Sequence, residues 1–297
     1  MTLPTTTPGE LGEVAAEAVR ETVGKARGVD NVSTFAETGA PVRWQAVADA
    51  GWDLAGVIED DDSATLRDLV AIADAWGEQL VPLPFIPSLL AKRHSAAAVE
   101  AGDGPVSISL PSPTLPAGSG VVPFGATDGV SVLRDLGSAP VALDPAASEP
   151  LDFDPLLRAS VVPFTTTLTH DFARELIVLW AAEVAGTART VVADAVAFTK
   201  EREQFGRPIG SFQAVKHHMA NAHISSQMAE TAAIWASLDE ANAIRSALHS
   251  FDESIAAIEL ALQVHGGLGF TWEMGIHFYL RHATFLRELS RGVATRA

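Results

Sequence analysis

Four long stretches of helical periodicity in the second half of the chain constrain its fold more than any other feature. They cover residues 169–201, 211–238, 241–265 and 273–290, and most are rich in alanine. Large apolar residues recur in them at helical spacing and share faces, as do Ile224, Met228, Trp235 and Leu238, or Ile255, Ile258 and Leu262. Long helices joined by short loops are typical of antiparallel bundles. The sequence therefore predicts a four-helix bundle in this part of the chain.

The middle of the chain has a different pattern. Between residues 102 and 164, short runs of β-branched and apolar residues alternate with clusters of Gly, Pro, Asp and Ser. Runs bounded by such turn residues predict strands. They lie at residues 106–110, 121–124, 130–133, 141–143 and 160–162. We therefore expect a small β module whose edges need covering.

The N-terminal third is again helical in pattern, from Leu11 to about Lys92. Pro82, Pro84 and Pro87 interrupt it. Because proline is tolerated in the first turn of a helix but not in its interior, we expect a short helix at residues 88–92 after them. The Thr- and Pro-rich residues 1–8 are expected to be loose. The predicted fold is mainly α with a small β module, and its predicted domains are residues 1–101, 102–164 and 165–297.

Composition narrows the functional classes. Hydrophobic residues make up 47% of the 297 residues and charged residues 19%, so a sizeable core can form. The net charge of −17 disfavours nucleic acid and anionic membranes as partners, and an anionic ligand would need a local basic patch. The absence of cysteine excludes disulfides and thiolate metal sites. With neither a secretory signal nor a membrane-spanning segment in the sequence, we expect a soluble cytoplasmic protein.

Two short runs carry the strongest indication of function. The first, from Arg202 to Gln213, reads REQFGRPIGSFQ and lies at a junction between two predicted helices. The second, from Gln263 to Gly269, reads QVHGGLG and ends a predicted helix with paired glycines. Arginine and exposed backbone N–H groups are the groups that bind a diphosphate. Together the runs indicate a site for a bulky anion.

The two runs, and the order of helical segment, β module and bundle, resemble the acyl-CoA dehydrogenase family. Residues 195–213 are similar to the family's bundle signature, and residues 263–269, followed by Glu273 and Arg281, to its C-terminal signature. Residues 43–52 and 66–87 are similar to its N-terminal helices and the proline-rich turn after them. The resemblance covers nearly the whole chain and is strongest in about the last 130 residues.

In this family, FAD lies at a subunit interface, and the bundle signatures of one subunit close over the ADP end of a flavin held by its neighbour. The resemblance implies that Arg202 contacts the diphosphate, that Phe205 packs against the flavin, and that Gln263 reaches the diphosphate or ribose. The full set of implied FAD-binding residues is Arg202, Gln204, Phe205, Ile209, Gln213, Gln263, Val264, Gly266 and Gly267.

Taken singly, these residues have simpler explanations. Arg202 could be a helix-end cation, the glycine pair a helix C-cap, and Phe205 a core residue. Their joint occurrence at the family's spacing favours the flavin site. His265 is expected to be a spacer, and His217, His218 and His223 are expected to line bundle surfaces rather than to bind a metal.

The catalytic base of the family has no counterpart at its expected positions. The resemblance places Ser290 where many members have a late glutamate, and Leu176 where others have the base on the first bundle helix. Glu175 is next to Leu176 in the sequence, but on a helix its side chain points about 100° away from the direction of residue 176. The β module is also short and lacks the loop that holds the isoalloxazine in the family. We therefore expect a half-site without catalytic residues of its own.

Some actinobacterial steroid-degrading acyl-CoA dehydrogenases are α2β2 assemblies of two unlike chains, and this sequence resembles their degenerate subunit. That resemblance implies a second acyl-CoA dehydrogenase-like partner, a shared FAD, a steroid-CoA substrate such as a cholesterol side-chain thioester, and an electron-transfer acceptor. Two alternatives stay open. One is a self-sufficient homo-oligomeric dehydrogenase using Glu175 as its base, and the other is a non-enzymatic scaffold that has lost flavin.

Overall fold

The computed structural model describes residues 5–27, 32–58, 63–144 and 148–295. Part of the loose segment expected at residues 1–8 lies outside the described residues. Helices form the N-terminal part: α1 (Glu10–Arg27), α2 (Val32–Thr38), α3 (Trp44–Asp49), the 3-10 helix η1 (Trp52–Leu54), α4 (Leu66–Gln79), α5 (Phe85–His94) and α6 (Ala96–Glu100). The helix α4 begins with a capping box in which the Thr65 side chain accepts from the Asp68 backbone and Asp68 from that of Thr65.

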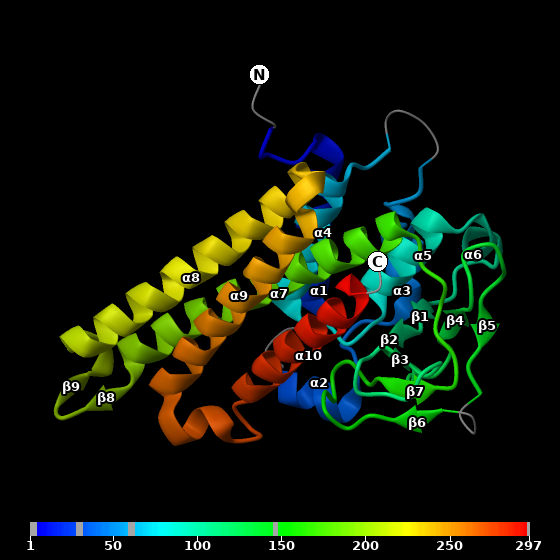
Figure 1. The fold of residues 1–297 in the computed structure, drawn as a ribbon. Coiled ribbons are helices and arrows are strands. Elements are labelled where there is room, and N and C mark those ends of the chain that lie inside the picture. Colours follow the sequence, from blue (N-terminus) through cyan, green and yellow to red (C-terminus); the bar gives the residue numbers. More distant parts are fainter. Residues whose placement is uncertain (1–4, 28–31, 59–62, 145–147, 296–297) are drawn as a thin grey trace.

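Four long helices form the bundle that the sequence predicts. They are α7 (His170–Glu201), α8 (Gln213–Leu238), α9 (Ala243–His265) and α10 (Ile276–Ala294). Short 3-10 helices join them: η3 (Ile209–Ser211), η4 (Glu240–Asn242) and η5 (Gly266–Phe270). Figure 1 shows α7, α8 and α9 running side by side, with α10 along α9 and toward the β module. The predicted fold class and the bundle are confirmed.

The β module consists of two small sheets. One has the order β1 (Val106–Ile108), β4 (Ser131–Leu133), β5 (Val141–Ala142), and the other β2 (Leu110–Pro111), β3 (Gly120–Val122), β7 (Ser160–Val162), β6 (Glu149–Pro150). The first sheet pairs β1 with β4 in parallel, whereas the second is antiparallel throughout. In Figure 1 the module lies at the opposite end of the molecule from the hairpin of β8 and β9.

The first bundle helix packs closely against the N-terminal helix α4. A Cβ atom at Gly77 of α4 would lie 1.8 Å from the carbonyl oxygen of Glu183, and one at Gly186 of α7 would lie 2.1 Å from that of Asp74. Such distances are impossible, so glycine is required on both sides of this crossing. Trp76 and Trp180 are fully buried on the same two helices. This contact fixes the N-terminal helices against the bundle.

Two details differ from the sequence expectations. The helix α5 begins at Phe85 rather than at residue 88, because Pro87 falls in its first turn, where no backbone N–H bond is lost. The strand β6 was not predicted: it has only two residues, both exposed, and an apolar pattern is absent. The other strands of the β module fall within or beside the predicted runs: the run at residues 106–110 is divided into β1 and β2, and β7 has the predicted bounds.

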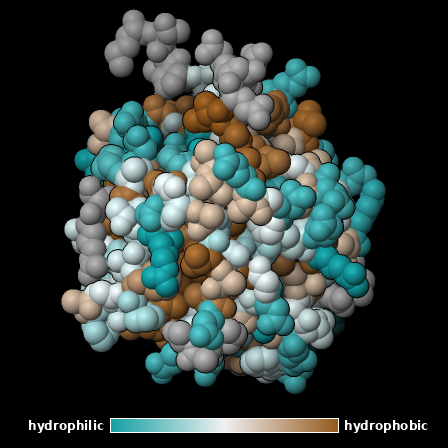
Figure 2. Space-filling view, turned by 90° about the vertical axis from the view of Figure 1, so that its right-hand side faces the viewer, coloured by the Kyte–Doolittle hydropathy of each residue, from teal (hydrophilic) through white to brown (hydrophobic). Residues whose placement is uncertain are grey.

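The helix α7 is long and apolar enough to cross a membrane by length and composition alone, although the sequence led us to expect no such segment. However, 83% of its apolar window is buried within the fold, as expected for the core helix of a bundle. On the side of the molecule that carries the β module, apolar side chains form patches interrupted by hydrophilic ones (Figure 2). Mixed surfaces of this kind are usual for folded proteins.

Candidate functional site

A short hairpin connects the end of α7 to α8. Strands β8 (Glu203–Gln204) and β9 (Arg207–Pro208) pair antiparallel, and Gln204 faces Arg207 across the turn. The two turn residues, Phe205 and Gly206, have φ angles of 54° and 76°. Positive φ at both central positions defines the type I′ turn, which suits glycine and strains a phenylalanine. The sequence placed this run at a helix junction but did not reveal the hairpin.

Phe205 projects from the tip of that hairpin. Its side chain is 91% exposed, and its ring meets that of Phe212 edge to face at 6.1 Å. The Arg207 guanidinium lies 4.0 Å above the Phe212 ring. A strained, exposed aromatic residue has no role in the core of its own chain, so the core interpretation of Phe205 is wrong. Strain of this kind is concentrated at functional sites.

A groove of about 500 Å³ lies beside the hairpin, between α8 and the end of α9. We call it the hairpin groove. It brings together five of the predicted FAD-binding residues: Gln204, Phe205, Ile209, Gln263 and Val264. Its remaining lining comes from Phe212, Ala214, Val215 and His218, which the sequence analysis did not name as site residues. Ala214 and Val215 lie four and three positions before His218, so the spacing of one helical turn among them was the signal that could have found them.

The other four predicted residues lie outside the lining of the groove. Arg202 follows α7 directly and is exposed. Its backbone anchors the hairpin, because its N–H donates to the Phe198 carbonyl at 2.9 Å and its carbonyl accepts from the Ile209 N–H at 2.8 Å. Within the described part of the chain, no ion pair or hydrogen bond occupies its guanidinium. Gln213, the first residue of α8, is also exposed.

The paired glycines end α9 and leave their backbone open. Gly266 has φ 58° and its N–H donates to the Gln263 carbonyl, which makes it the C-cap. A Cβ added at Gly266 or at Gly267 would meet no heavy atom within 4 Å. Among the residues that the structure describes, therefore, nothing packs against Gly267 that would require a glycine. Gly266 and Gly267 therefore present open backbone at the end of α9.

The histidines near the groove have structural roles. His265 is buried, its Nδ1 lies 2.8 Å from the Ala261 carbonyl oxygen, and its ring stacks on Phe198 at 4.3 Å. The Nε2 atom of His218 lies 2.9 Å from the Leu260 carbonyl oxygen and so ties α8 to α9. His265 is thus a packing residue rather than a plain spacer.

Neither of the two positions at which the family resemblance places the catalytic base carries a carboxylate. Ser290 on α10 is fully buried, and a serine hydroxyl cannot accept the proton that a carboxylate would accept. Leu176 is also fully buried. Glu288 is exposed and pairs with Arg287 and Arg291, each at 3.0 Å. None of these side chains can serve as a general base in a substrate pocket.

Glu175 is buried in an ionic cluster, which we call the Glu175 cluster and which comprises Glu175, Arg93 and His94. One carboxylate oxygen accepts from Arg93 Nε at 2.9 Å and lies 2.8 Å from His94 Nε2. Burial alone would raise the pKa of Glu175, but hydrogen bonding to His94 and the charge of Arg93 outweigh it and lower the pKa. Arg93 also donates to the Gly56 and Ala64 carbonyls. A low pKa and full pairing make Glu175 a poor base.

A second buried cluster joins the β module to the bundle. His282 of α10 lies with Nδ1 2.8 Å from an Asp154 carboxylate oxygen and Nε2 3.6 Å from a Glu183 oxygen. Burial by itself lowers the pKa of His282, but the two carboxylates raise it to about 10. The neighbouring Arg281 donates to the carbonyls of Asp152 and Phe153. Consecutive residues of α10 thus hold the loop between β6 and β7.

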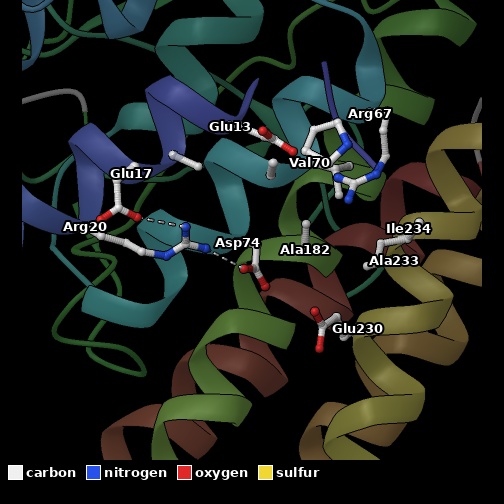
Figure 3. A pocket seen from close by; sticks show the side chains of 13 residues that line it. Glu13, Glu17, Arg20, Arg67, Val70, Asp74, Ala182, Glu230, Ala233 and Ile234 are labelled. Carbon is white, nitrogen blue, oxygen red and sulfur yellow. Dashed lines mark ion pairs between the residues drawn. The ribbon is translucent and has the colours of Figure 1, made fainter. Parts of the chain in front are cut away.

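A third charged region surrounds a cavity of about 430 Å³ between α1, α4, α7 and α8. Figure 3 shows Arg20 pointing toward Asp74, with Glu230 on the opposite wall. Asp74 and Glu78 both pair with Arg20 and with Arg189. Burial raises the pKa of Asp74 even though Arg189 opposes the shift. Because the carboxylates are paired with arginines, this region is an ion-pair network linking α1 to the bundle.

Sequence and structure comparisons agree with the signatures. The family model for the acyl-CoA dehydrogenase C-terminal domain matches residues 172–290. The acyl-CoA dehydrogenase IpdE2 of Mycolicibacterium smegmatis is 32% identical over 235 residues, which cover 73% of this chain and 72% of that protein. The chain belongs to the acyl-CoA dehydrogenase family. Another relative, the acyl-CoA dehydrogenase FadE34 of Mycobacterium tuberculosis, is 34% identical over 79% of this chain, but the match spans only 38% of FadE34.

Solved structures share the fold over nearly the whole chain. The ChsE4-ChsE5 complex from Mycobacterium tuberculosis contains a chain with a TM-score of 0.78 and 19% identity, matched over 99% of this chain and 97% of that one. The steroid ACAD variant Tcur3481-Tcur3483 gives the same TM-score and identity, over 98% and 97%. At this level of identity the similarity establishes the fold.

Proposed function

We propose that this chain is a cytoplasmic subunit of a heteromeric FAD-dependent acyl-CoA dehydrogenase, in which it supplies part of the FAD site and no catalytic base. The observation that carries the proposal is a contrast within the chain. The flavin-binding signatures meet at an open groove, whereas the positions expected for the base hold Ser290 and Leu176, and the adjacent Glu175 is paired with Arg93 and His94. A chain so built needs a partner for the reaction.

The residues of this chain would bind and orient the cofactor. Arg202 would neutralise the diphosphate, the open backbone at Gly266 and Gly267 would admit it, and Phe205 would cover the flavin from the hairpin tip. When bound, the flavin supplies the electron acceptor for dehydrogenation of a CoA thioester at its α and β carbons. The partner would hold the isoalloxazine and the base that takes the α proton.

The substrate class and assembly are supported by the relatives. The similar structures include one described as a complex of two chains and one described as a steroid ACAD. Together with the short β module, they support a steroid side-chain CoA substrate and an α2β2 assembly of two acyl-CoA dehydrogenase-like chains. The division into domains at residues 1–101, 102–164 and 165–297 stays a prediction, as does the electron-transfer acceptor.

The test is to purify the chain alone and together with the acyl-CoA dehydrogenase chain encoded beside it, and to compare flavin absorbance and turnover of a steroid-CoA. We expect flavin and activity in the co-purified complex and neither in the chain alone. Stoichiometric flavin and turnover in the chain alone would overturn the proposal and favour a homo-oligomer using Glu175. A complex whose flavin is indifferent to Arg202→Ala would favour the scaffold alternative.

A further inference from the structure

Two of the four lysines of the chain, Lys200 and Lys216, line one groove. The groove, which we call the lysine groove, has a volume of about 480 Å³ and lies between the end of α7 and the beginning of α8. The other two lysines, Lys25 and Lys92, each pair with a carboxylate of the fold. Within the described residues, by contrast, no ion pair or hydrogen bond engages the ammonium group of Lys200 or Lys216. Folding of this chain therefore leaves two cations available at one place.

The helix dipole explains only one of these two cations. Lys200 lies in the last turn of α7, where a cation interacts favourably with the dipole. Lys216 is the fourth residue of α8, and side chains of a helix tilt toward its N-terminus, where the dipole disfavours a cation. The first turn of α8 contains no acidic residue that would compensate. Lys216 is therefore placed at a cost to the helix that a bound anion would offset.

The sequence around the lysine groove reverses the charge of the chain. Residues 196–219 contain four Lys or Arg and two Asp or Glu, whereas the rest of the chain contains 16 and 35. No Asp or Glu belongs to the lining of the groove. An anion is repelled by most of this acidic protein but is attracted here. The groove therefore favours a negatively charged ligand.

The rest of the lining shows which kind of anion fits. Val196, Pro208, Val215 and Met219 form the apolar part of the groove. Thr199 has no hydroxyl proton to offer a ligand, because it donates to the Val196 carbonyl at 2.8 Å. An exposed ion pair contributes little by itself, so most of the affinity has to come from apolar surface buried on these residues. The lining therefore suits a molecule with one negative group on an apolar body.

We propose that the lysine groove binds an amphipathic carboxylate, whose carboxylate group pairs with Lys200 and Lys216. Its apolar body would lie on Val215 and Met219. The site differs from the proposed FAD site, because the lysine groove and the hairpin groove have only Val215 in common among their lining residues. The ligand is a free carboxylate rather than a CoA thioester, and its binding does not depend on flavin or on the proposed function.

Isothermal titration calorimetry of the chain alone with octanoate tests the proposal. We expect saturable binding, and we expect Lys216→Met to raise the dissociation constant about tenfold, because a charge-assisted hydrogen bond is lost while the aliphatic part of the side chain is kept. Lys25→Met is the matched control and should leave the dissociation constant unchanged, since Lys25 lies on α1 with its side chain 73% exposed. A dissociation constant that neither Lys200→Met nor Lys216→Met changes, or equal affinity for 1-octanol, would overturn the proposal. Circular dichroism establishes that each variant is folded.

Reductive methylation of lysines with formaldehyde, read by mass spectrometry of the peptides, tests the site in the unaltered chain. At an octanoate concentration of about twice its dissociation constant, the bound carboxylate should slow methylation of Lys200 and Lys216 about threefold and leave that of Lys25 unchanged. Equal slowing at Lys25 would show non-specific adsorption, and equal slowing by inorganic phosphate would show a plain anion site. Either result would overturn the proposal. Flavin absorbance plays no part in these measurements, so their failure would leave the proposed function intact.

Discussion

The hairpin groove and the Glu175 cluster differ in the state of their polar groups. At the hairpin, Arg202 and Gln213 are exposed, and the glycine pair presents open backbone. In the cluster, Glu175 is buried and every strong contact is made within the chain. The first arrangement keeps groups available for a ligand, whereas the second uses them for folding. A family resemblance alone does not show whether a polar residue is available to a ligand or is paired within the fold.

The largest effect is expected from breaking the cluster. Glu175→Ala leaves the Arg93 guanidinium buried without its carboxylate, and loss of one partner of a buried pair costs about 3 kcal/mol or more. We expect the free energy of unfolding, measured by urea denaturation, to fall by about that amount. The control is Glu288→Ala, an exposed carboxylate, for which a change below about 0.5 kcal/mol is expected.

The same position separates the proposed function from its main alternative. Glu175→Gln keeps a side chain of the same size, and the co-purified complex that carries it should retain most of its turnover. Abolished turnover at unchanged stability would identify Glu175 as a base, and the contrast between the two regions would then fail.

The pH dependence of the free energy of unfolding sharpens the comparison. At alkaline pH we expect the buried His282 to dominate this dependence. The pKa of His282 is raised from 6.5 to about 10 in the folded state, so its stabilising contribution is complete below about pH 6.5 and is lost as the pH rises toward 10. The loss should be on the order of 3 kcal/mol between pH 6.5 and 9. Chemical denaturation at a series of pH values measures it.

His282→Gln should remove most of this decrease in the free energy of unfolding at alkaline pH, and it should also lower the stability of the protein at neutral pH. The exposed His249→Gln is the matched control and should leave the slope in place. A slope that survives His282→Gln would mean that another group causes it. The Glu175 cluster should show the opposite sign: since the pKa of Glu175 is lowered, its contribution is present above the unfolded value of 4.5 and lost as the pH falls below it.

Arg202→Ala addresses the other region. Because the guanidinium has no partner among the described residues of its own chain, the substitution should leave stability within about 0.5 kcal/mol. The complex should bind FAD about tenfold more weakly or worse, as expected for loss of hydrogen bonds to a charged group. FAD titration of the deflavinated complex measures the affinity. Arg245→Ala, at the other end of α9, is the control, and equal losses of affinity and stability at Arg202 would contradict the assignment.

The sequence predicted the long elements well and the short ones poorly. Bundle helices carry many repeats of one apolar period, so α7 to α10 were found to within a few residues. The hairpin of β8 and β9 has two residues a strand and depends on a strained turn at Phe205, for which a phenylalanine gives no local signal. Similarly, Glu175 and Arg93 are 82 positions apart in sequence, and no local pattern predicts that they pair.

The smallest expected effect gives the cleanest comparison. Gly267 does not adopt a positive φ, and a Cβ at this position meets no atom of the chain, so Gly267→Ala should leave stability unchanged or raise it by up to about 1 kcal/mol. In the complex the added methyl group would stand between the backbone and the diphosphate, and FAD affinity should fall several-fold. Gly104→Ala, a glycine with equally open surroundings outside the bundle, is the control. Unchanged FAD affinity for Gly267→Ala would mean that this backbone is not approached by the cofactor, and would leave helix capping as the whole reason for the glycine pair.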